Sequence, residues 1–152
     1  MNPVDQNSTQ TSTEGRHRVL FILWFAFLMS VVFYFAITII VPRAATGQSD
    51  GMLFFVLAAA GASLVVFSVV LKRKLLGQSV EKQRPDLVQT AYIVALALCE
   101  AAGIFGLVLY FATTERLYYL LFILSGAGLL LHLPRRRHLL EASFKEQARN
   151  LG

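Results

Sequence analysis

The chain has 152 residues, of which 56% are hydrophobic and 15% are charged, and its net charge is +5. This composition lies outside the usual range of soluble domains, and a mean hydropathy of +0.59 predicts an integral membrane protein. The sequence contains no nucleophile paired with a base, no metal-ligand spacing and no phosphate-binding glycine loop, so we expect neither an enzyme nor a cofactor.

Four apolar segments follow a polar amino-terminal stretch. Residues 1–15 lack an apolar period, so we expect a disordered tail. Transmembrane helices are predicted at residues 19–41, 52–71, 90–112 and 117–133, because each is close to the ~20 residues that a ~30 Å hydrocarbon core requires. A helix satisfies its own backbone hydrogen bonds inside a membrane. The predicted fold class is therefore all-α, an antiparallel bundle of four transmembrane helices.

Basic residues gather beside these spans and not in one continuous patch, which favours membrane orientation over nucleic-acid binding. They precede the first span, fill the loop at residues 72–89 and follow the fourth span in the tail at residues 134–152. This asymmetry predicts that both termini and the loop are cytoplasmic. The tail also has apolar residues at helical spacing, so we expect a helix on the membrane surface, with a solvated tail as the alternative. Both basic segments are predicted to bind anionic lipid.

Glu100 is the single acidic residue within the four predicted spans, and it lies close to the predicted bilayer midplane. Placing an ionised acid at that depth costs about 3 kcal/mol, and apolar surroundings disfavour the charged form. Glu100 is therefore a candidate proton carrier. The structural alternative is a hydrogen bond to Ser30, Ser63 or Ser125, each of which lies near the middle of its own span and would link two helices.

The same segment carries a stripe of small residues about 130° from Glu100 around the helix axis. Its members are Ala91, Ala95, Cys99, Ala102 and Gly106. Small side chains let a neighbouring helix approach closely, so we expect a packing face here and Glu100 on another face. His132 lies near the far end of the fourth predicted span, which favours an interfacial position over a pair with Glu100.

The stretch "QTAYIVALALCEAAGIFGLVLYF" resembles the second helix of the F-type ATP synthase c subunit, the proteolipid of the rotating ring. The similar features are a glutamate in an apolar helix, a small-residue turn after it and then "FGLV". The preceding "EKQRPDL" is similar to the polar loop of that family. The resemblance covers residues 53–112, mainly the Glu100 helix.

This resemblance implies a role for each matching part. Glu100 corresponds to the carboxylate that takes up and releases the translocated ion, and a proton is the implied ion. The polar loop of the family contacts the central stalk, which implies a partner contact for Gln83, Arg84, Pro85 and Asp86.

Two hypotheses follow. In the first, the chain is a four-helix membrane protein with a c-subunit-like hairpin around Glu100, which exchanges a proton or packs beside an ion-translocating complex, as a homo-oligomer or complex member in the bacterial inner membrane. In the second, it is a structural or assembly protein that binds a partner or anionic lipid, with Glu100 hydrogen-bonded inside the bundle. The two differ in whether Glu100 titrates.

Overall fold

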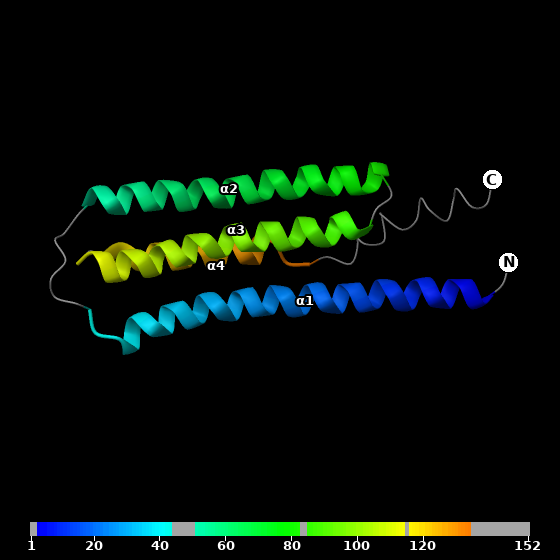
Figure 1. The fold of residues 1–152 in the computed structure, drawn as a ribbon, viewed down its shortest axis with the longest axis horizontal. Coiled ribbons are helices and arrows are strands. Elements are labelled where there is room, and N and C mark those ends of the chain that lie inside the picture. Colours follow the sequence, from blue (N-terminus) through cyan, green and yellow to red (C-terminus); the bar gives the residue numbers. More distant parts are fainter. Residues whose placement is uncertain (1–2, 44–50, 83–84, 115, 135–152) are drawn as a thin grey trace.

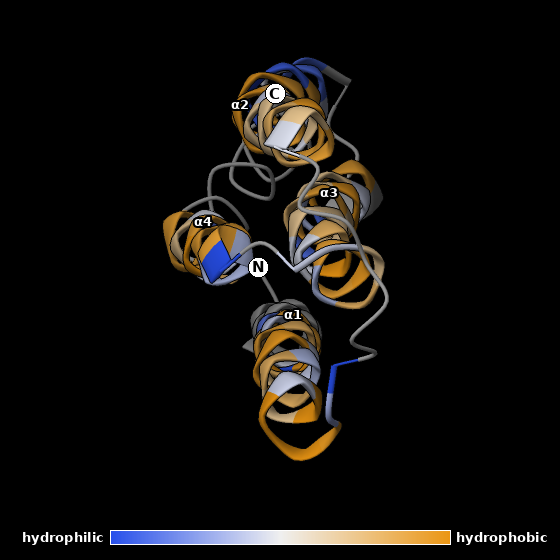
Figure 2. Cartoon of the chain, turned by 90° about the vertical axis from the view of Figure 1, so that its left-hand side faces the viewer, coloured by the Kyte–Doolittle hydropathy of each residue, from blue (hydrophilic) through white to orange (hydrophobic). Residues whose placement is uncertain are grey.

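The computed structural model describes residues 3–43, 51–82, 85–114 and 116–134. These residues form four α-helices and no strand, which confirms the all-α class. The elements are α1 (Pro3–Ile40), α2 (Gly51–Lys82), α3 (Pro85–Ala112), the 3-10 turn η1 (Arg116–Tyr118) and α4 (Tyr119–Leu131). Successive helices run antiparallel (Figure 1). Seen end-on, α3 and α4 lie on opposite sides of the space between α2 and α1 (Figure 2).

Three of the helices are long and apolar enough to cross a membrane, as predicted. The segments are His17–Ile40, Gly51–Ser79 and Leu87–Ala112, and hydrophobic colouring predominates on the helices in the end-on view (Figure 2). Large apolar side chains such as Phe33 and Ile39 are 65% and 72% exposed. A helix that is apolar all round and still exposed is suited to lipid surroundings.

The helix α1 begins at Pro3 and includes most of residues 1–15, where we predicted disorder. Proline is favoured at the first position of a helix, and a helix that is already nucleated gains one hydrogen bond for each residue added. The polar composition shows that this stretch has no apolar face to pack against other helices, but it does not prevent the stretch from being helical. At its other end α1 stops at Ile40, because Pro42 disfavours the helical conformation of the residue before it.

The predicted loop at residues 72–89 is mostly helical. The helix α2 continues to Lys82, and α3 already begins at Pro85. The residues after Lys72 are mainly strong helix formers, and Leu76 packs against the buried cluster of Leu20, Val88 and Tyr92. The run of charges marks where the apolar span ends, and the helix itself extends beyond it.

The fourth helix is shorter than the predicted span at residues 117–133. The helix α4 has 13 residues, or about 20 Å at ~1.5 Å per residue, and even with η1 it is only a short apolar helix, Arg116–Leu131. It ends at Leu131, with His132 as the C-cap, because Pro134 removes an amide donor and restricts the residue before it. The helix α4 is therefore too short to run along the full length of α3, which has 28 residues.

The small-residue stripe of α3 lies in the core of the bundle. Ala91 and Ala95 are each 1% exposed, and Cys99 and Ala102 are fully buried. A Cβ atom at Gly106 would lie 3.2 Å from Leu121 Cβ on α4. The stripe is thus a close-packing face, as its composition indicates.

Arg43, just after α1, connects the end of that helix to the end of α3. Its Nη1 donates to the Thr114 carbonyl oxygen at 3.0 Å, and its guanidinium carbon lies 4.6 Å from the ring centroids of both Tyr110 and Tyr118. The Tyr110 hydroxyl donates to the Val41 carbonyl oxygen at 2.6 Å. We call these residues the Arg43 clasp.

Candidate functional site

Glu100 lies near the middle of α3, on the side that faces α1. Its Oε1 atom accepts hydrogen bonds from the hydroxyl of Ser30 and from the hydroxyl of Tyr34, the latter at 3.1 Å. Ser30 and Tyr34 are four residues apart on α1, a spacing that places two side chains on one face of a helix. Glu100 itself is only partly buried, so its side chain borders the outside of the bundle.

A close crossing of three helices holds this site in place. Gly103 lies one turn along α3 from Glu100, and a Cβ atom there would be 3.4 Å from Val31 Cγ2 on α1 and 3.1 Å from Ser125 Oγ on α4. The missing side chain lets both helices approach α3. Further along α1, the indole N–H of Trp24 donates to the carbonyl oxygen of Leu129 at 2.8 Å, which links α1 to α4.

The structure separates the three serines that were candidate partners of Glu100. Ser30 contacts the carboxylate. Ser63 lies on an exposed face of α2, where its hydroxyl donates to the Ala59 carbonyl oxygen at 2.7 Å. Ser125 is buried against Gly103, and its Oγ has no hydrogen-bond partner among the described residues. The three serines lie near the middle of their helices, but only Ser30 contacts Glu100, because the side chains of Ser63 and Ser125 face other directions.

The predicted partner loop falls largely outside the described part of the chain. Gln83 and Arg84 lie outside the described residues. Pro85 and Asp86 form the first turn of α3, but their side chains are not among those described. Of the predicted tail at residues 134–152, only Pro134 is described.

The sequence reasoning missed Tyr34 as a partner of Glu100. Its signal was the spacing from Ser30, since two hydroxyl side chains four residues apart in an apolar helix form one polar face. In an apolar helix these two hydroxyl groups need hydrogen-bond partners on a neighbouring helix. Glu100 is the acidic residue within the three membrane-length segments.

A second polar cluster, also missed, lies on a different side of α3, where it meets α2 and the end of α4. The Oγ atom of Ser68 on α2 is 2.8 Å from His132 Nε2 and 3.4 Å from Cys99 Sγ, and it also donates to the Val65 carbonyl oxygen at 2.6 Å. The Ser68 hydroxyl thus contacts a backbone carbonyl, an imidazole and a thiol, each of which can take part in a hydrogen bond. His132 is 2% exposed and lies directly after α4, so it is buried among the helices. Its interfacial depth in the membrane stays a prediction.

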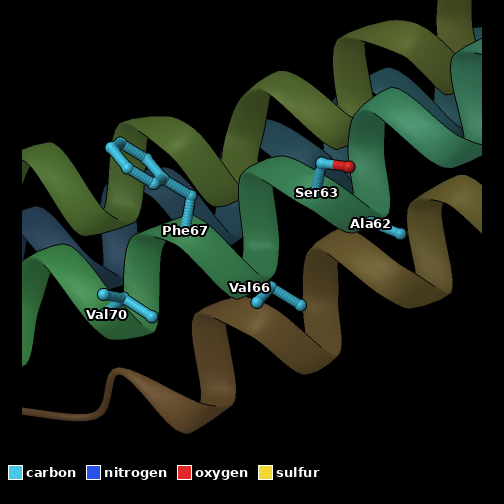
Figure 3. Close-up of a pocket in the computed structure, with 5 residues that line it drawn as sticks. All are labelled: Ala62, Ser63, Val66, Phe67 and Val70. Carbon is cyan, nitrogen blue, oxygen red and sulfur yellow. The ribbon is translucent and has the colours of Figure 1, made fainter.

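Neither cluster has the composition of a metal centre. No group of three or more His, Cys, Asp or Glu side chains that could hold a metal occurs in the described part of the chain. A shallow groove along α2 is lined by apolar side chains and one serine (Figure 3). Its residues are Ala62, Ser63, Val66, Phe67 and Val70, and none of them titrates.

Comparison with protein-family models, with curated proteins and with solved structures found no match to this chain.

Proposed function

We propose that the chain is a small non-enzymatic membrane protein in which Glu100 takes up and releases a proton within the bilayer. The observation that carries this proposal is the pair of hydroxyls, Ser30 and Tyr34, on one oxygen of a partly buried carboxyl group. A hydroxyl donates to an ionised carboxylate and accepts from a protonated acid. The same contacts therefore serve both protonation states, so the carboxyl can exchange a proton without dismantling the bundle.

The proposed topology follows from the placement of basic residues. Arg18 on α1 and Lys72, Arg73 and Lys74 on α2 lie at the same end of the bundle, and the positive-inside rule assigns that end to the cytoplasm. The helix α4 starts at the opposite end and runs back toward it, so we assign both termini to the cytoplasm. Together with the c-subunit resemblance, this topology supports the proposal that α2 and α3 are a proteolipid-like hairpin in a bacterial inner membrane, in a homo-oligomer or a larger membrane complex.

The proposal is tested by labelling native membranes with an apolar carbodiimide across a range of pH and locating the adduct by mass spectrometry. The reagent reacts with a protonated carboxyl group, so we expect an adduct on Glu100 that declines as the pH rises. Glu100→Gln is the control and should remove the adduct. Absence of labelling at every pH would contradict proton exchange.

A second function is favoured by the same two hydrogen bonds, which join α1 to α3. In this alternative Glu100 is a fixed structural link in an assembly protein, and each bond contributes about 0.6 to 2 kcal/mol. Glu100→Gln keeps an oxygen that accepts from both hydroxyls, whereas Glu100→Leu removes it. Three results together would establish the structural role. Glu100 is not labelled at any pH, Glu100→Gln leaves the stability unchanged, and Glu100→Leu lowers it.

A further inference from the structure

The basic residues at one end of the bundle lie at a common level. Counted along the helices from Ile40, Gly51 and Ala112, the residues Arg18 on α1, Lys72 to Lys74 on α2 and Tyr92 on α3 are about 30 to 35 Å away, at ~1.5 Å per residue. This distance matches the ~30 Å thickness of the hydrocarbon core. These charges therefore coincide with the headgroup layer when the opposite helix ends lie at the other surface.

Packing beneath these charges fixes their positions. Leu20 of α1, Leu76 of α2, and Val88 and Tyr92 of α3 form one buried cluster, so three helices are held together at this level. The continuation of α2 to Lys82 places its basic residues on a rigid helix. We call Arg18, Lys72, Arg73 and Lys74 the basic collar.

The collar presents its cationic groups outward. Arg18, Arg73 and Lys74 are exposed, and Lys72 Nζ lies over the Tyr92 ring, 4.0 Å from its centroid. This cation–π contact holds the Lys72 ammonium group at the level of the collar. The exposed acids described nearest this end, Glu14 and Glu81, lie one and two helical turns beyond the collar and away from the apolar spans. The boundary between apolar and polar surface is therefore positively charged.

We propose that the basic collar binds the headgroups of anionic phospholipids. Lipids of this kind would place their acyl chains against the exposed apolar side chains of α1 or of α2, and their phosphates at the depth of the collar. Guanidinium groups pair with phosphate oxygens through two parallel hydrogen bonds, and lysine adds a point charge. This inference is independent of Glu100, because it uses different residues at a different depth.

The test is native mass spectrometry of the full chain from micelles that contain equal amounts of phosphatidylglycerol and phosphatidylcholine. We expect the wild-type protein to retain phosphatidylglycerol preferentially. Arg73→Gln should lower the ratio of anionic to zwitterionic lipid bound by roughly five-fold, and the double variant R73Q/K74Q should lower it further. The matched control is Arg116→Gln, which removes an exposed arginine at the opposite end of the bundle and should leave the ratio unchanged.

Three results would overturn the proposal. The first is equal retention of the two lipids by the wild-type protein. The second is an equal loss of anionic lipid in the Arg73→Gln and Arg116→Gln variants, which would show that net charge and not the collar selects the lipid. The charge-retaining variant R73K/K74R should keep the preference, so a loss there would also contradict it. Unchanged Trp24 fluorescence checks that each variant is folded.

Discussion

Replacing Gly128 with alanine should destabilise the bundle by creating one defined clash. A Cβ atom at this position would lie 2.8 Å from Cys99 Sγ and 3.3 Å from Val65 Cγ1. Cys99 is completely buried and its thiol also contacts Ser68, so a shift of the sulfur would disturb its packed neighbours. Overpacking of a close-packed core costs about 1 to 3 kcal/mol. We therefore expect Gly128→Ala to lower the free energy of unfolding by about that amount.

The assay is reversible unfolding in mixed micelles titrated with sodium dodecyl sulfate and followed by Trp24 fluorescence. Trp24 is the single tryptophan of the chain, and its indole donates to the carbonyl of Leu129, the residue after Gly128. In the Cys99→Ala background the clashing sulfur is gone, so adding Gly128→Ala should lower the stability much less than it does in the wild-type protein. The control is Gly126→Ala, where a Cβ atom would meet no other atom within 4 Å. A stable Gly128→Ala variant, or one that Cys99→Ala fails to rescue, would refute this reasoning.

Three further changes test other contacts by the same titration. Tyr34→Phe removes one donor to Glu100 and keeps the ring, so stability should fall by about 0.5 to 1.5 kcal/mol; an unchanged midpoint would mean that this hydrogen bond contributes nothing. Arg43→Gln removes the guanidinium that contacts two tyrosine rings and should cost about 1 kcal/mol or more, and faster amide hydrogen exchange at the end of α3 should accompany it. Ser68→Ala leaves the buried His132 imidazole without its partner and should cost about 1 to 3 kcal/mol. A smaller loss in S68A/H132L than in S68A would identify the unpaired imidazole as the cause.

The sequence predicted the three membrane-length helices well because apolar length is a direct consequence of bilayer thickness. The end of α3 at Ala112 and its start at Pro85 both have local signals, an apolar run that stops and a proline suited to a first turn. The extension of α2 to Lys82 has no such signal in hydropathy, because hydropathy describes which residues lie in lipid and not where a helix ends. The helical residues after Pro3 are a second example of this difference.

The candidate site was harder to predict than the helices. Position along a span indicates depth, so Ser30, Ser63 and Ser125 were equivalent candidates for Glu100. The direction that each side chain faces depends on which helices are neighbours, and that is decided by contacts such as Gly103 against Val31. The burial of His132 likewise depends on its position against Ser68 of α2, which the apolar count alone did not reveal.

The hydrogen bonds of Glu100 also set an order of events during synthesis. Ser30 and Tyr34 precede Glu100 by 70 and 66 residues, which at about 5 to 20 residues per second corresponds to an interval of roughly 3 to 14 s. Throughout that interval the first helix has been made while its acidic partner has not. The second and third helices, joined by a very short connection, can pair as soon as both have emerged. Attachment of the first helix is therefore a late step of biogenesis, and a ribosome that stalls before Glu100 leaves that helix without its polar partner.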